Sequence, residues 1–96
     1  MKIKILRSAR QDLIDGYLFY EQQSAGLGEY FRDSLISDID SLLIHARSHS
    51  IMHGKHRKVA SHFPYSIFYL VEGNEICIHA IIDNRRDPEW ISGRLN

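Results

Sequence analysis

Two groups of basic residues in this chain have the side-chain types that handle phosphate groups and protons. They are Lys55, Arg57, Lys58 and His62 in the middle of the chain, and Arg85 and Arg86 after the last apolar run. Arginine and lysine stabilise negative charge on a phosphate, and histidine transfers protons near neutral pH. If a sheet brings the groups together, they form a candidate catalytic site. The structural alternative is that Arg85 and Arg86 form salt bridges with acidic helices, and one arginine can do this while the other faces outward.

Four histidines recur at spacings of four, four and three residues: His45, His49, His53 and His56. On a continuous helix they would share one face, and two such imidazoles can hold zinc. Gly54 and the serines around His49 indicate that the helix has already ended, and no cysteine or acidic residue lies nearby to complete a site. We therefore expect no metal and no cofactor, and interpret this segment as a flexible, pH-sensitive basic loop.

The charge of the chain is balanced overall but unevenly distributed. The formal net charge is +0, which argues against nucleic-acid binding driven by the charge of the whole molecule. Residues 11–44 contain seven acidic residues against the single base Arg32, whereas residues 45–71 contain four bases, five of the six histidines and no acid. The sequence therefore predicts an acidic half and a basic half. The single cysteine, Cys77, lies in an apolar run and is expected to be a buried thiol.

The first half of the chain predicts one strand and two helices. Lys2 to Leu6 alternates basic and apolar residues, which is typical of a short edge strand. Ser8 and Gln11 have the spacing of a capping box for a helix over residues 8–23, with Ala9, Leu13, Tyr17 and Tyr20 at helical spacing. A second apolar stripe from Leu27 to Ala46 predicts a long helix, which pairs with the first as an antiparallel hairpin. The aspartates off this stripe are expected to be solvated: Asp15, Asp33, Asp38 and Asp40.

The second half predicts a sheet. Residues 47–58 are interpreted as a polar loop, followed by a strand near 58–60. Strands over residues 65–71 and 76–82 are joined by a turn containing Gly73 and Asn74, and Pro64 must lie at a strand start, bend or edge. Both strands are apolar on both faces, which places them in the middle of the sheet. The order strand, helix, helix, strand, strand, strand predicts an α+β fold, with an antiparallel-rich sheet and the helical hairpin packed on one face.

The length of 96 residues predicts a single domain over residues 1–96. The apolar run at the start of the chain is too short for the core of a signal peptide. No apolar stretch approaches the length of a membrane span. We therefore expect a cytoplasmic protein with no membrane partner.

Three segments resemble one known family. The string Phe63-Pro64-Tyr65-Ser66-Ile67-Phe68-Tyr69, the ending Arg85-Arg86-Asp87-Pro88-Glu89-Trp90 and the early Ala9-Arg10-Gln11-Asp12-Leu13 resemble the RelE/ParE toxin superfamily, most closely its ParE, or plasmid-stabilisation, branch. The resemblance covers essentially the whole chain. It implies the toxin of a type II toxin–antitoxin module, held inactive by a cognate antitoxin.

The resemblance implies one of two activities. ParE-like members act on DNA gyrase, and RelE-like members cut mRNA on the ribosome. Ribonuclease members place an arginine where Ser66 aligns, and often a histidine where Asp83 stands; serine cannot neutralise a phosphate, and aspartate repels one. We therefore favour gyrase inhibition by binding, without catalysis. The alternatives are an mRNA endoribonuclease using the basic residues above, and a non-toxic interaction module with a decayed active face.

The residues expected to contact a target or partner are Arg57, Lys58, Tyr65, Arg85, Arg86 and Trp90. For two of them, packing is the favoured interpretation. Trp90 is expected to be buried as the anchor of the tail on the sheet, and Tyr65 to pack in the core with Phe68 and Tyr69. The expected assemblies are a homodimer or a toxin–antitoxin heterotetramer.

Overall fold

The computed structural model describes all 96 residues and has an α+β fold. Its elements in chain order are β1 (Lys2–Ile5), α1 (Arg7–Gln23), α2 (Leu27–Asp40), α3 (Leu42–His45), β2 (Ile51–Met52), β3 (Lys55–Val59), β4 (Tyr65–Glu72), β5 (Glu75–Asp83) and α4 (Pro88–Leu95). None of the helices combines the length and the apolar character that crossing a membrane requires.

The five strands form one mostly antiparallel sheet in the order β1-β5-β4-β3-β2. Only β1 runs parallel to its neighbour β5. β4 and β5 occupy the centre, as their two apolar faces predict, and β1 is an edge strand whose Lys2 and Lys4 are exposed. Gly73, with φ of +60°, lies in the predicted turn between β4 and β5.

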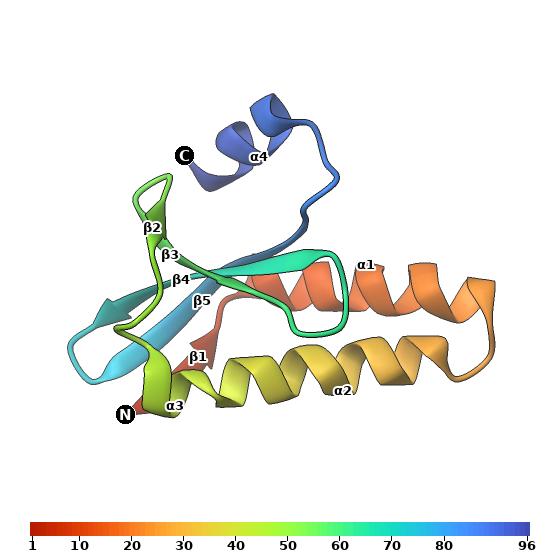
Figure 1. Cartoon of the computed structure of the whole chain (residues 1–96), viewed down its shortest axis with the longest axis horizontal. Helices are drawn as coiled ribbons and strands as arrows, with labels where there is room; N and C mark the ends of the chain where they lie inside the picture. Colours follow the sequence, from red (N-terminus) through yellow and green to blue (C-terminus); the bar gives the residue numbers. More distant parts are fainter.

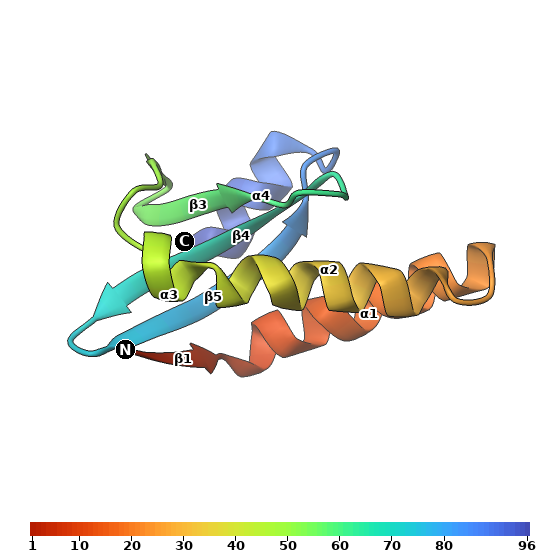
Figure 2. The same cartoon turned by 60° about the horizontal axis from the view of Figure 1, so that its bottom comes forward.

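The helical hairpin covers one face of the sheet, and α4 lies on the other face (Figures 1 and 2). The main core between the hairpin and the sheet contains 15 buried residues, including Phe31, Leu35, Ile67 and Tyr69. The cluster between α4 and the sheet contains only four buried residues, which are Phe68, Ala80, Ile82 and Leu95. The two faces are therefore covered very unequally.

The hairpin brings its helices together at small residues. A Cβ added at Gly28 would lie 2.6 Å from the Tyr17 carbonyl oxygen, so only glycine permits this approach of α2 to α1. Gly26 has φ of +90° in the connection between the helices. The Glu21 carboxylate accepts hydrogen bonds from the backbone N–H groups of Gly26 (3.0 Å) and Gly28 (2.9 Å). These contacts fix the tip of the hairpin.

Three sequence predictions about the helices are wrong. The capping box does not form: α1 begins at Arg7 without a side-chain cap, and Ser8 Oγ donates to the His79 carbonyl oxygen across the fold. The long second helix is interrupted at Ser41, whose Oγ donates to the Asp38 carbonyl oxygen at 2.6 Å. Asp38 is buried, not solvated, because its carboxylate accepts hydrogen bonds from Ser61 N and Ser61 Oγ in the loop before β4. Hydrogen bonds to residues distant in sequence decide the positions of Ser8 and Asp38, whereas the hydrogen bond at Ser41 is local.

The predicted loop at residues 47–58 contains a hairpin. β2 and β3 pair across a two-residue turn of His53 and Gly54, whose φ values are +54° and +74°. Positive φ at both turn residues is the geometry that matches the twist of antiparallel strands. The sequence signal was present in the His53-Gly54 pair, but the short strand β2 has no apolar alternation to support it.

Candidate functional site

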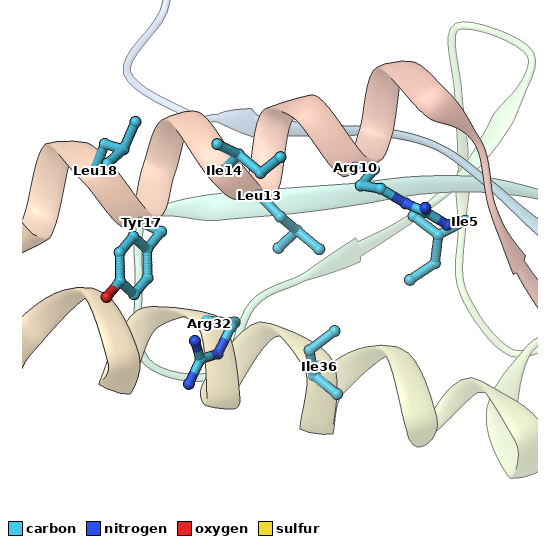
Figure 3. A pocket seen from close by; sticks show the side chains of 8 residues that line it. All are labelled: Ile5, Arg10, Leu13, Ile14, Tyr17, Leu18, Arg32 and Ile36. Carbon is cyan, nitrogen blue, oxygen red and sulfur yellow. The ribbon is translucent and has the colours of Figure 1, made fainter.

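An apolar groove of about 550 Å³ runs between α1 and α2 on the outside of the hairpin. We call it the helix groove; Ile5, Arg10, Leu13, Ile14, Tyr17, Leu18, Arg32 and Ile36 line it. Figure 3 shows Leu13 pointing from α1 toward the gap between the helices, with Arg32 and Ile36 facing it from α2. Ile14 and Leu18 are 46% and 51% exposed. Large apolar side chains left open in a concave surface mark an interaction site.

Two arginines flank the helix groove, and they differ in their partners. Arg32 is 5.6 Å above the Tyr17 ring and forms exposed ion pairs with Glu29 and Asp33. Arg10 forms no ion pair. The Arg10 end of the groove therefore has an unpaired positive charge that could pair with an acidic side chain.

The helix groove exists because α1 has apolar residues on two sides. Ala9, Leu13, Gly16 and Tyr20 form the buried side. Ile14 and Leu18 lie four residues apart on a second side that no part of the chain covers. The first side was predicted from the sequence, and the second was not. Its available signal was the Ile14–Leu18 spacing, which duplicates the helical period outside the core stripe.

A second depression, of about 250 Å³, lies on the opposite face of the sheet, between β3, β4 and α4. We call it the arginine pocket; Met52, His53, Arg57, Phe68, Asn84, Arg86, Pro88 and Ile91 line it. Two arginines and one histidine contribute to this lining, and no carboxylate does. The pocket therefore has the charge that suits an anionic group.

Arg57 is held in a fixed orientation within the arginine pocket. Its Nε donates to Ser66 Oγ at 2.9 Å, and Ser66 Oγ donates to Asn84 Oδ1 at 2.6 Å. Arg57 and Ser66 meet because Val59 pairs with Ser66, so Arg57 is a diagonal neighbour on the same face of the sheet. Ser66 itself cannot neutralise a phosphate, but Arg57 of the adjacent strand β3 places a guanidinium beside it. Asn84, which the sequence analysis did not select, completes the network.

Arg86, which lines the arginine pocket, forms a cation–π pair with Trp90, which lies outside that lining in a second depression with Asp12 and Asp15. The Arg86 guanidinium carbon lies 4.1 Å from the centroid of the Trp90 ring. The prediction that Trp90 is buried is wrong: 41% of it is exposed, because α4 turns this side chain away from the sheet and toward Arg86. Both residues are available for contact from outside.

Arg85 is neutralised by its own strand end. Its guanidinium contacts the Asp83 carboxylate at 2.7 Å, and the hydrogen bonds and charge of Arg85 hold the pKa of Asp83 below its ordinary value. The expected salt bridge to the acidic helices therefore does not form, and Asp83 replaces them as the partner. The two adjacent arginines have divided roles, with Arg85 paired internally and Arg86 facing outward.

The remaining basic residues of the sequence cluster are not brought together with Arg57. Side chains alternate along β3, so Lys58 lies on the face covered by the helical hairpin, where it pairs with buried Ile67. His62 lies in the β3–β4 loop with its ring 6.0 Å from that of Tyr30 on α2. Lys55 is on the α4 side, where its Nζ donates to the Leu95 carbonyl oxygen at 2.8 Å. Only Arg57 and Arg86 of the six proposed catalytic residues line the arginine pocket.

The aromatic residues of β4 pack within the protein, as expected. Tyr65, Phe68 and Tyr69 are 8%, 2% and 0% exposed. Burial raises the pKa of Tyr65 and of Tyr69 to about 12, so both phenols stay protonated near neutral pH. Tyr69 Oη donates to the Ala46 carbonyl oxygen at 2.6 Å. Cys77 is also buried, as its sequence context predicts.

Two of the four regularly spaced histidines pack around Tyr69. The His56 ring stacks on Tyr69 at 5.1 Å, and its Nδ1–H donates to the His49 carbonyl oxygen at 2.9 Å. His49 meets the Tyr69 ring edge-on, and burial lowers the pKa of His49. His53 lies in the β2–β3 turn, and no group of three or more His, Cys, Asp or Glu side chains is arranged to hold a metal ion.

Comparison with solved structures finds a protein of the same fold. A chain of the structure described as "Chromosomal ParDE TA system from P. aeruginosa" superposes with a TM-score of 0.75 at 24% sequence identity, covering 86% of this chain and 95% of that chain. No protein-family model and no curated protein matches. The resemblance that the sequence motifs predict is thus confirmed for the fold: this chain shares the α+β fold of that ParDE-system chain.

Proposed function

We propose that this chain is the toxin of a type II toxin–antitoxin module, that a cognate antitoxin neutralises it, and that it inhibits DNA gyrase by binding. The observation that carries the proposal is the helix groove on a chain whose fold is shared with a ParDE system. A groove with exposed Ile14 and Leu18 needs a partner to cover it.

The partner that fits the helix groove is an amphipathic helix from the antitoxin. Its apolar stripe contacts Ile14 and Leu18, and an acidic residue pairs with Arg10. The edge strand β1 ends at Ile5, which also lines the groove, so an extended segment of the same antitoxin could add to the sheet. The assembly expected in solution is a toxin–antitoxin heterotetramer, with a homodimer as the alternative for the toxin alone.

Gyrase is the proposed target because proton-transfer groups are scarce around the arginine pocket. RNA cleavage needs a base and an acid as well as cations. Lys58 and His62 lie elsewhere, and Tyr65 is buried with a pKa of about 12. Binding without catalysis requires only the exposed Arg86, Trp90 and the oriented Arg57.

The decisive experiment is pulse labelling after induction of this chain without its neighbouring antitoxin gene. Thymidine and methionine incorporation are followed in the same cells over the first minutes. Early loss of thymidine incorporation with methionine incorporation intact is the expected result, and purified gyrase is then tested directly. Early loss of methionine incorporation would overturn the gyrase target. If neither falls and growth is normal, the chain is a non-toxic interaction module.

The second candidate function is a ribosome-dependent mRNA endoribonuclease. The Arg57–Ser66–Asn84 network favours it, because it places an oriented guanidinium where a phosphate would bind. His53 lines the same pocket and supplies an imidazole. This function predicts new 5′ ends on translated mRNA that disappear in Arg57→Ala and persist in Lys58→Ala, because only Arg57 lines the pocket.

A further inference from the structure

Helix α4 is attached to the rest of the protein mainly by its last turns. Residues 84–90, which connect β5 to α4 and begin the helix, are all exposed. Leu95 is buried, and with the partly buried Ile91 it packs against Phe68, Ala80 and Ile82 of the sheet. The helix is therefore joined to β5 through an exposed connection and is packed on the sheet by its last turns (Figure 1).

Two basic side chains fasten the end of α4. The first, Arg94, forms an ion pair with Asp12 of α1 at 2.6 Å and donates to the Ser8 carbonyl oxygen at 3.4 Å. The Arg94 and Asp12 side chains are only 24% and 18% exposed. Asp12 also accepts a hydrogen bond from the backbone N–H of Ile81 in β5. The second is Lys55, whose Nζ donates to the Leu95 carbonyl oxygen at 2.8 Å. Asp12 thus joins three elements that are distant in sequence.

The Asp12–Arg94 pair is poorly suited to stabilising the whole fold. Burial raises the pKa of the Asp12 carboxyl, although the Ile81 hydrogen bond and the charge of Arg94 act in the opposite direction. A buried ion pair contributes little net stability where desolvation offsets the attraction between its charges, and its best-attested role is to select one arrangement over another. Here the arrangement selected is the docked position of α4.

The docked position of α4 closes one side of the arginine pocket. Pro88 and Ile91 line the pocket together with Arg57 and Phe68. We propose that α4 is a hinged lid over the arginine pocket, with residues 84–87 as its hinge and the Asp12–Arg94 ion pair as its latch. Release of the latch uncovers an apolar strip of Phe68, Ala80 and Ile82 beside Arg57. This lid does not depend on whether the chain is a toxin.

The test is amide hydrogen exchange on the full-length chain. Arg94→Gln removes the charge from the latch, and we expect exchange in residues 88–95 to accelerate on the order of tenfold, because a hydrogen bond to a charged group is lost. Exchange in α2 and in β3 to β5 stays at the wild-type rate. The matched control is Arg32→Gln, which removes a basic residue whose ion pairs lie on the surface of the hairpin and leaves α4 exchange unchanged.

A second pair of measurements separates a latch from a general loss of structure. Asp12→Asn should accelerate α4 exchange as Arg94→Gln does, and the double variant should be no faster than either single variant, because both remove one interaction. Trp90 is the single tryptophan of the chain and lies on α4, so acrylamide quenching of its fluorescence should rise in the same variants.

Two results would overturn the lid. Unchanged α4 exchange in both Arg94→Gln and Asp12→Asn would mean that the ion pair does not hold the helix. Equal acceleration in α4 and in the central strands would mean that the pair supports the whole fold and that α4 does not move independently.

Discussion

The two faces of the sheet differ in how they are covered and in what they leave open. The hairpin face has a core of 15 buried residues and, outside it, an apolar groove with nothing over Ile14 and Leu18. The α4 face has four buried residues and a cationic pocket around Arg57. The hairpin face thus presents an exposed apolar surface, and the α4 face presents oriented charge beside the proposed lid. An apolar surface suits stable binding of a partner, whereas oriented charge suits recognition of an anionic or acidic target.

The largest expected effect is the difference in stability lost when a buried side chain is truncated on each face of the sheet. Phe31→Ala should lower the free energy of unfolding by about 3–5 kcal/mol, because Phe31 is fully buried among Tyr20, Phe63 and Tyr65 and leaves a cavity. Leu95→Ala should cost clearly less, because Leu95 packs in the smaller cluster of four buried residues. Urea unfolding of both variants measures the difference. Equal losses of unfolding free energy would show that the two faces contribute equally to stability.

Charge placed in the helix groove should separate antitoxin capture from toxicity. Ile14→Glu with Leu18→Glu should weaken antitoxin binding by at least about 100-fold, because central apolar contacts contribute about 2 kcal/mol or more each. Toxicity without the antitoxin should remain, since the arginine pocket is on the other face. Leu43→Glu with Ile44→Glu is the matched control, because these residues are exposed outside the groove. Calorimetric titration gives the affinities. If the control variant weakens antitoxin binding as much as the groove variant does, the helix groove is not the binding site.

The arginine pocket should depend on guanidinium geometry as well as on charge. Arg57→Ala should reduce target inhibition roughly 10- to 100-fold, in line with loss of an oriented charged contact. Arg57→Lys should recover only part of it, because lysine lacks the planar fork that Ser66 orients. Antitoxin affinity should not change in either variant. Full recovery by lysine in a growth-inhibition assay would show that charge alone matters.

The smallest expected effect is a pH dependence at the His49–Tyr69 contact. Burial, Lys58, His45 and His56 lower the pKa of His49 from 6.5, so the folded state holds this group neutral. The unfolded chain binds the proton more readily, and stability is therefore present above about pH 6.5 and falls as the pH drops below it. His49→Gln should flatten the fall of the thermal midpoint below about pH 6.5. An unchanged profile would show that His49 is solvated in the folded protein.

The sequence was sufficient for the elements whose apolar residues repeat regularly. The stripes of Leu13 and Tyr20 in α1 and of Phe31, Leu35 and Ile39 in α2 place both helices, and the doubly apolar runs of β4 and β5 place these strands in the centre. Elements without such a repeat were missed. β2 has two exposed residues, and α4 is held by contacts to residues more than 12 positions away.

Within the candidate site, the sequence identified the residue types but not their grouping. Arg57 and Arg86 were expected and do share a pocket, whereas Lys58 and His62 were expected with them and do not. Asn84 was not expected, because an asparagine after a strand end has no distinctive pattern of its own. The helix groove was missed as well, since its residues read as an ordinary part of an amphipathic helix.

What the sequence determined by itself was local: periodicity of 3.6 or 2 fixes which residues share a face of a helix or strand. What only the tertiary structure decided was which faces meet. Strand pairing placed Arg57 beside Ser66, and docking of α4 placed Arg94 on Asp12, 82 residues away. Such contacts depend on register and chain closure across the whole fold, and adjacency along the chain carries no information about them.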